Sequence, residues 1–246
     1  MPSEQSGSSA LSKPWQNKAR IQLLAAVAGV LPLYSSLIIY QLRGNQPPSL
    51  HGFIFYLAVI SPLAIMIALL LLRFLCGENP RVLNLRPGTL SSDLIAALIL
   101  SLVVLVANVV SNYVLSGLLP ASASKTSIRA LFVEVAGKPG LLILFIGPLM
   151  FLGAASEELI RVFLLNRLWK VWPSTVGKIV AVLISACLFG LIHVYRGPAH
   201  VLWTTICGLI MALYYLRFGR VVPLILAHYA TNAFQVAVVA MLSRVP

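Results

Sequence analysis

The sequence predicts an all-α, polytopic integral membrane protein, a bundle of about seven transmembrane helices. Hydrophobic residues make up 59% of the chain and charged residues only 10%, whereas soluble domains have about 25% charged residues. The mean hydropathy is +0.94. Apolar stretches long enough to cross a bilayer as helices also recur along the chain. The lipid bilayer is therefore the first partner that we predict.

Charge and cysteine content exclude two other classes of protein. The net charge is +12, which in a soluble domain would suggest nucleic-acid binding. Here the cations lie between apolar segments, where membrane topology and anionic lipid account for them, so no nucleic-acid partner is expected. The cysteines form no CxxC or Cys/His spacing, so we expect neither a disulfide framework nor a structural zinc site.

The N-terminal part divides into a tail and three spans. Residues 1–18 are polar and rich in Ser and Gln, and we predict that they are disordered, with residues 19–246 forming a single membrane domain. The apolar stretch at about 21–42 is longer than the apolar region of a signal peptide and lacks a clear cleavage site, which indicates an uncleaved span. Further spans are predicted at about 52–76 and 93–118, the latter beginning at typical helix-capping residues.

The longest connection, at about 119–139, carries an amphipathic pattern. Ile128, Leu131, Phe132 and Val135 stand at positions i, i+3, i+4 and i+7. This spacing favours a short helix in the membrane interface, with an ordinary packed loop as the alternative. The remaining predicted spans are about 140–169, 176–195, 200–218 and 221–243.

The distribution of basic residues predicts the orientation. If the N-terminus is cytoplasmic, eleven basic residues lie inside: Lys13, Lys18, Arg20, Arg73, Arg81, Arg86, Arg167, Lys170, Lys178, Arg217 and Arg220. Six lie outside: Arg43, Lys125, Arg129, Lys138, Arg196 and Arg244. Because cytoplasmic loops of membrane proteins are enriched in Lys and Arg, we expect a cytoplasmic N-terminus.

Glu157, Glu158 and Arg161 form a charge cluster inside the predicted span 140–169. A charged residue deep in a bilayer costs roughly 2.5–3.5 kcal/mol on insertion scales, so the cluster indicates either a functional site or a buried salt bridge that locks helices together. On a helix Arg161 can reach either carboxylate. The spacing does not decide which one, and the carboxylate left unpaired would suit a general base.

Two later spans carry polar residues that could join this cluster. His193 lies near the end of the span 176–195, on the same helical face as Phe189, although a hydrogen-bonded structural histidine is an alternative. His228 and Asn232 are four residues apart, so both project from one face of the last helix. A carboxylate, two imidazoles, a carboxamide and a guanidinium from three spans are the components of a hydrolase site.

These motifs resemble those of the CAAX-protease and bacteriocin-processing (CPBP/ABI) family of glutamic-type intramembrane endopeptidases, which includes the type II CAAX prenyl proteases. Phe189-x-x-x-His193 matches the family's FxxxH, and His228-x-x-x-Asn232 matches its HxxxN. The similar region covers about residues 90–243.

The first motif departs from the family pattern by one position. Arg161 follows Glu157 by four residues, whereas the arginine of the family's EExxxR follows the first glutamate by five. The resemblance implies three roles: activation of water by Glu157 with His193, stabilisation of the tetrahedral oxyanion by His228 and Asn232, and support of these groups by Glu158 and Arg161.

The resemblance also implies a substrate and leaves several alternatives open. The expected substrate is a lipidated or membrane-anchored peptide or protein, of which a prenylated CAAX protein is one case. We expect no cofactor and no metal, but one Glu and two His could also hold a catalytic zinc ion, so a zinc metallopeptidase is the alternative mechanism. A non-catalytic membrane immunity or scaffold protein and a proton-coupled transporter are the alternative functions, and the oligomeric state stays open.

The helical rise poses a geometric problem for such a site. At 1.5 Å per residue from the nominal cytoplasmic ends, Glu157 would lie about 16 Å deep, His193 about 25 Å and His228 about 10 Å. The three side chains can therefore meet only if helices are tilted, overlong or broken.

Overall fold

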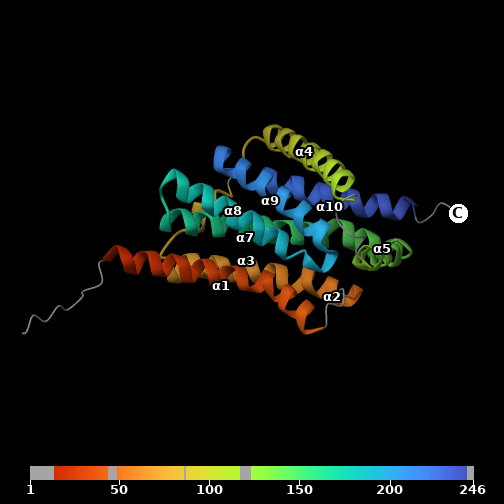
Figure 1. Cartoon of the computed structure of the whole chain (residues 1–246), viewed down its shortest axis with the longest axis horizontal. Coiled ribbons are helices and arrows are strands. Elements are labelled where there is room, and N and C mark those ends of the chain that lie inside the picture. The colour runs from red at the N-terminus through yellow and green to blue at the C-terminus, as the bar shows by residue number, and fades with distance from the viewer. Residues whose placement is uncertain (1–13, 44–48, 86, 117–122, 243–246) are drawn as a thin grey trace, which may run out of the picture.

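The computed structural model describes residues 14–43, 49–85, 87–116 and 123–242, and these residues form helices with no strand among them (Figure 1). The predicted all-α fold class is confirmed. Most of the predicted disordered tail, residues 1–13, lies outside the described residues. The first helix already begins at Pro14, a residue that is favoured at the first helical position because its missing N–H would have no partner there.

Every predicted span corresponds to a helical segment. The helices are α1 (Pro14–Leu42), α2 (Leu50–Phe55), α3 (Ser61–Leu70), α4 (Leu90–Ser116), α5 (Ala123–Ala136), α6 (Pro139–Leu144), α7 (Met150–Val171), α8 (Thr175–Leu191), α9 (Pro198–Phe218) and α10 (Val222–Leu242). Within the described ranges, six continuous segments are long and apolar enough to cross a membrane: Lys18–Leu42, Leu50–Leu75, Leu90–Ser111, Pro139–Val171, Pro198–Phe218 and Val222–Leu242. Helix α8 is apolar but shorter, with 17 residues, or about 25 Å.

Two of the spanning segments contain wider π-helical turns. The segments η1 (Tyr56–Ile60) and η2 (Leu71–Leu75) continue α2 and α3, and η4 (Phe145–Leu149) joins α6 to α7. Pro148 lies in η4 and cannot complete a regular α-helical hydrogen bond, so the wider turn lets the helix continue past it. The resulting segment of 33 residues is overlong for a bilayer and has Glu157 near its middle.

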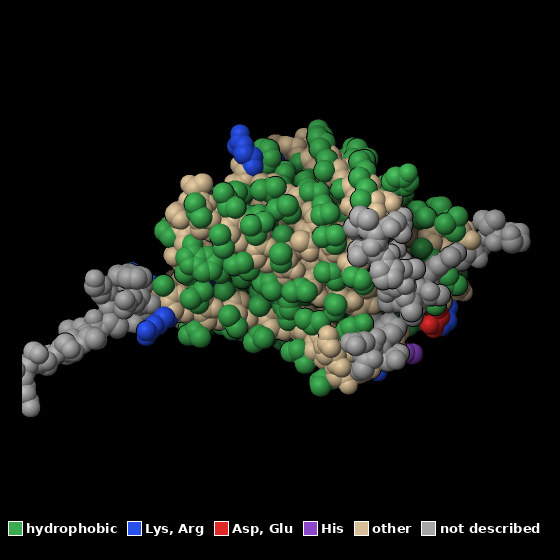
Figure 2. All heavy atoms as spheres, in the orientation of Figure 1, with side chains coloured by type: hydrophobic (Ala, Val, Ile, Leu, Met, Phe, Trp, Pro, Cys, Tyr) green, Lys and Arg blue, Asp and Glu red, His purple; other side chains and the backbone are tan. Residues whose placement is uncertain are grey.

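Helix α7 lies at the centre of the bundle (Figure 1). It packs against α1, α3, α8 and α10, while α4 packs outside against α9 and α10. Val162, Phe163 and Leu165 of α7 are completely buried. Hydrophobic side chains cover much of the visible outer surface in the middle of the bundle (Figure 2). The visible Lys and Arg side chains lie toward its two ends. An apolar outer surface and a polar centre suit a protein that is solvated by lipid.

The long connection contains helix α5, as its amphipathic pattern predicts. Leu131, Phe132 and Val135 are buried in a second hydrophobic cluster, which includes Phe145 of η4 and Met150 of α7. This packing explains the apolar face of the helix, and its position in the membrane interface stays a prediction.

A buried ion-pair cluster ties the ends of several segments together. Arg167 of α7 is completely buried and donates two hydrogen bonds of 2.8 Å to the Glu78 carboxylate, which follows η2. Arg167 also donates to Gln22 of α1 at 2.7 Å, and Lys170 lies 2.6 Å from Glu78. The sequence did not predict this cluster because its members are up to 145 positions apart.

Acid should weaken this cluster. Burial raises the pKa of the Glu78 carboxyl, but hydrogen bonds and positive charge from Arg167 and Lys170 outweigh it and lower the pKa from 4.5 to about 2. Such a carboxylate stabilises the fold above its unfolded pKa and loses this contribution as the pH falls toward the folded value. We expect the wild type to melt above Glu78→Gln at pH 7, and the difference to shrink between about pH 4.5 and about pH 2.

Thermal unfolding in detergent measures this difference. The matched control is Glu134→Gln, which removes an exposed carboxylate paired with Lys138 and should follow the wild type at neutral pH. A stability difference between wild type and Glu78→Gln that is equal at pH 7 and at pH 2 would contradict the prediction.

Candidate functional site

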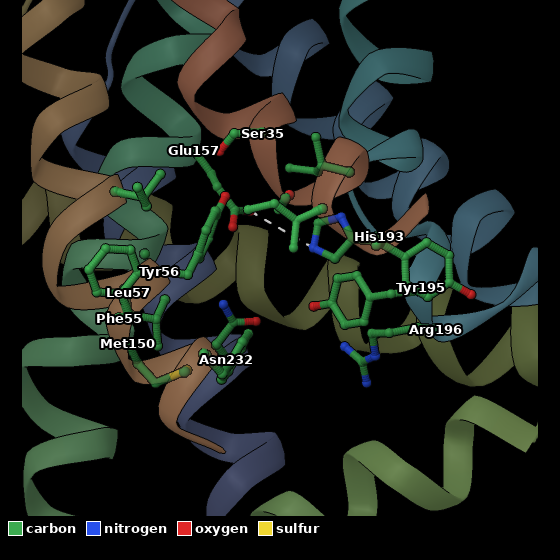
Figure 3. Close-up of a pocket in the computed structure, with 18 of the residues that line it drawn as sticks. Ser35, Phe55, Tyr56, Leu57, Met150, Glu157, His193, Tyr195, Arg196 and Asn232 are labelled. Carbon is green, nitrogen blue, oxygen red and sulfur yellow. Dashed lines mark ion pairs between the residues drawn. The ribbon is translucent and has the colours of Figure 1, made fainter. Parts of the chain in front are cut away.

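The residues singled out in the sequence come together at the centre of the bundle. Glu157 lies on α7, His193 directly after α8, and His228 on α10. The Glu157 Oε2 atom is 3.9 Å from Nε2 of His193 and 3.7 Å from Nε2 of His228. Figure 3 shows the Glu157 carboxylate facing the His193 ring. Two imidazoles from different segments therefore converge on one carboxylate oxygen.

His193 lies outside the helix in which the sequence placed it. Helix α8 ends at Leu191, four residues before the end of the predicted span, and the chain turns through η5 (Val194–Arg196) into α9. His193 and Phe189 still lie together, because His193 Nδ1 is 2.9 Å from the Phe189 carbonyl oxygen. The imidazole thus provides a partner for one of the carbonyls that are left without intrahelical partners at the end of α8.

Hydrogen bonding indicates which nitrogen of each imidazole carries the proton. A carbonyl oxygen can only accept, so His193 Nδ1 is the donor to Phe189 and its Nε2 is left as an acceptor. His228 Nδ1 lies 2.8 Å from Glu158 Oε1 and donates to this carboxylate in the same way. Both rings consequently present Nε2 toward Glu157.

The second glutamate is the one that pairs with the arginine. Arg161 Nη1 donates to Glu158 Oε2 at 2.8 Å, and both residues are buried. The Arg161 guanidinium also lies 3.8 Å above the Phe189 ring. Glu157 Oε2, by contrast, is buried without a hydrogen-bond partner among the described residues. Although Arg161 stands one position earlier than in the family motif, its guanidinium lies inside the site and pairs with Glu158.

The site opens into a cavity of about 230 Å³ between α1, α2 with η1, α7, η5 and α10. Glu157, His193 and Asn232 lie on its wall, and the Asn232 carboxamide points into the cavity in Figure 3. A smaller cavity of about 50 Å³ adjoins Glu158 and His228, and it shares His193 and Asn232 with the first. The six predicted site residues thus surround two neighbouring cavities.

The cavity residues that the sequence analysis did not single out as functional candidates include Tyr56, Tyr195 and Arg196. Tyr56 belongs to η1, and Tyr195 and Arg196 belong to η5. Tyr56 lies in the N-terminal part of the chain, which carries no motif. For Tyr195 and Arg196, the sequence indicates a role in the site only through their closeness to His193. In the sequence, Arg196 counts only among the basic residues that predict the membrane orientation.

Close contact between α8 and α9 positions His193. A Cβ atom at Gly190 would lie 2.7 Å from the Val201 carbonyl oxygen and would also meet the Thr205 hydroxyl. Only glycine therefore lets the two helices approach this closely without a shift. Because Gly190 is three residues before His193, the same contact fixes the position of the imidazole.

A zinc ion at this site would need Glu157 and both Nε2 atoms as ligands, as the chemistry of these groups allows. Among the described residues, no group of three His, Cys, Asp or Glu side chains has an arrangement that could hold a metal ion. The carboxylate and the two imidazoles have the chemistry to transfer protons to and from a water molecule placed between them.

Comparison with known proteins supports the resemblance seen in the motifs. Residues 139–234 match the family described as type II CAAX prenyl endopeptidase Rce1-like. This match is shorter than the region suggested by the motifs, and it contains all six predicted site residues. No curated protein and no solved structure matches the chain. The segment that carries the site is therefore similar to the Rce1-like family of type II CAAX prenyl endopeptidases.

Proposed function

We propose that the protein is an intramembrane endopeptidase that hydrolyses a peptide bond in a membrane-anchored, lipid-modified substrate. One observation carries this proposal: Oε2 of Glu157, which has no hydrogen-bond partner among the described residues, faces two imidazole Nε2 atoms beside a cavity in the centre of the bundle. The match of this segment to an endopeptidase family supports it.

In the first step, a water molecule between Glu157 and His193 attacks the scissile carbonyl carbon. Glu157 takes one proton from the water, and the Nε2 lone pair of His193 accepts a hydrogen bond from the other O–H. The water oxygen forms a bond to carbon while the carbonyl π electrons move to oxygen. A carboxylate without another hydrogen-bond partner at Oε2 is well placed to act as this base.

In the second step, His228 and Asn232 stabilise the oxyanion. The Asn232 carboxamide donates an N–H, and His228 donates Nε2–H when its ring carries both protons. Glu158 accepts the Nδ1–H of His228 at 2.8 Å and thereby stabilises the imidazolium, as the buried carboxylate does in a Ser-His-Asp triad. One such donor typically contributes 10²–10³-fold in rate.

In the last step, the tetrahedral intermediate collapses. The C–N bond breaks, and the proton held by Glu157 passes to the leaving amine. One water molecule is consumed, and the Glu157 carboxylate is regenerated. Arg161 holds the Glu158 carboxylate in place through the hydrogen bond of 2.8 Å, so the two adjacent glutamates have different roles.

The cavity wall supports an apolar, membrane-bound substrate. Phe53, Phe55, Leu57, Ile60 and Met150 line it, and an apolar chain or a prenyl group would pack against such a surface. A prenylated CAAX peptide is the substrate class that the matched family suggests. The cytoplasmic position of the N-terminus, which the distribution of basic residues favours, is part of the same proposal.

The experiment uses the purified protein in liposomes with a farnesylated Cys-aliphatic-aliphatic-X peptide, and it identifies the products by mass spectrometry in H₂¹⁸O. We expect cleavage of one peptide bond and one ¹⁸O atom in the new carboxylate. We also propose that no metal takes part, so activity should persist in a strong zinc chelator. Loss of activity that added zinc restores would establish the metallopeptidase alternative, and proton-driven uptake without cleavage would favour the transporter.

A further inference from the structure

Arg196 places a positive charge inside the cavity that would hold the substrate. This residue ends η5 and lines both cavities together with His193 and Asn232. Figure 3 shows its side chain below Tyr195, with Asn232 in the same lower part of the cavity. Arg196 is partly buried. Arg196 is thus part of the wall of both cavities.

No described carboxylate neutralises Arg196. The chain has six acidic residues, of which Glu4 lies outside the described residues. The other five have different partners: Glu78 with Arg167 and Lys170, Asp93 with Arg220, Glu134 with Lys138, Glu158 with Arg161 and His228, and Glu157 with the two imidazoles. Within the described part of the chain, Arg196 is therefore a cation without an acidic partner.

Such a charge is costly unless an anion joins it. Burial lowers the pKa of Arg196 below its ordinary value, and the Tyr195 phenol offsets this only in part. Charged residues in poorly hydrated parts of membrane proteins usually pair with another group or mark a path for a ligand. Because the protein's described carboxylates are engaged elsewhere, the partner of Arg196 would come from a ligand.

The backbone holds Arg196 at a set position relative to the hydrolytic residues. Its N–H donates to the His193 carbonyl oxygen at 2.9 Å, and the Gly197 N–H donates to the Val194 carbonyl oxygen at 2.9 Å. Gly197 has φ +91° and ψ 167°, a conformation that is essentially restricted to glycine, and it connects η5 to α9. An anion bound to Arg196 would lie beside the peptide bond that His193 and Asn232 contact.

We propose that Arg196 determines specificity by binding a carboxylate of the substrate, namely its C-terminal α-carboxylate. This inference rests on the proposed function. A guanidinium can bind a carboxylate through two parallel hydrogen bonds, which sets the direction of the bound chain. A cavity of about 230 Å³ beside the hydrolytic residues can take the last few residues of a chain, whose α-carboxylate would then lie within reach of Arg196.

The test compares two farnesylated peptides that differ only in a free or amidated C-terminus. For the wild type we expect kcat/KM for the free acid to exceed that for the amide on the order of 10- to 100-fold, the range for a hydrogen-bonded charge pair. Arg196→Gln should remove this preference by slowing cleavage of the acid alone, and Arg196→Lys should restore part of it. The control Arg217→Gln, which changes an exposed cation outside both cavities, should keep the wild-type ratio.

Two results would overturn the inference. The first is a wild type that cleaves both peptides equally well, and the second is an Arg196→Gln variant that slows both by the same factor, as a purely structural role predicts. A third peptide, amidated but ending in aspartate, identifies the source of the carboxylate. If it regains the Arg196-dependent preference, Arg196 binds a side-chain carboxylate and the assignment to the chain terminus is wrong.

Binding measurements separate this inference from the proposed function. Fluorescent acid and amide peptides are titrated into the Glu157→Gln protein with and without Arg196→Gln. One outcome is that the wild type cleaves neither peptide, while the Glu157→Gln protein binds the acid more tightly than the amide only when Arg196 is present. This outcome would support the carboxylate site and contradict the endopeptidase function. Cleavage by the wild type with no preference in either assay would contradict the carboxylate site alone.

Discussion

Replacing Glu157 by glutamine is expected to lower kcat for peptide cleavage by about 10²–10⁴-fold, the usual contribution of a general base. Glutamine keeps the shape of the side chain but cannot accept a proton from water. Folding should be unaffected, because Glu157 Oε2 has no hydrogen-bond partner among the described residues that the change could remove. Initial rates with the farnesylated peptide in liposomes measure the effect, and thermal unfolding confirms that the variant is folded.

The matched control for this prediction is Glu134→Gln. Glu134 is an exposed glutamate of α5 whose partner is Lys138, four residues later. It lines neither cavity, so the variant should cleave the peptide at the wild-type rate. A folded Glu157→Gln protein with wild-type kcat would show that another group activates the water.

Replacing Arg161 by methionine should have the largest effect on stability. Glu158 is completely buried, and its carboxylate would lose the guanidinium that lies 2.8 Å from it. Removing one partner of a buried ion pair typically costs about 3–5 kcal/mol, because the other charge stays behind without compensation. We expect a large drop in melting temperature and a low yield of the folded protein.

The double variant Glu158→Gln/Arg161→Met separates stability from activity. It removes both buried charges, so it should regain most of the stability lost in Arg161→Met. It should stay poorly active, because His228 loses the carboxylate that stabilises its imidazolium. The control Arg217→Met changes an exposed arginine and should melt like the wild type. A double variant as unstable as the single one would show that the buried carboxylate is not the cause.

Much of the fold could be predicted because the bilayer imposes simple rules. Backbone groups in hydrocarbon must find partners within the protein, so long apolar segments become helices, and the seven expected segments are all helical. Local periodicity also predicted α5, whose Leu131, Phe132 and Val135 are buried. Helix ends were harder to predict, since η5 and Gly197 end α8 through turn geometry that hydropathy does not reflect.

The candidate site was predicted in its components but not in its arrangement. Helical spacing put Arg161 within reach of both glutamates, and only packing shows that it pairs with Glu158. The rise per residue placed Glu157, His193 and His228 at different depths. They meet because Glu157 lies in a segment of 33 residues, whereas His193 follows a helix of 17.

By itself, the sequence determined that this is a helical membrane protein with a charged cluster, two histidines and an asparagine among its apolar segments. Composition and short-range spacing are sufficient for this, because they depend on residues within a few turns of one another. Only the tertiary structure decided that Arg161 pairs with Glu158 and not with Glu157, and that Arg196 lines the same cavity as Glu157. Both facts depend on how segments far apart in the chain pack together, and hydropathy and periodicity carry no information about such packing.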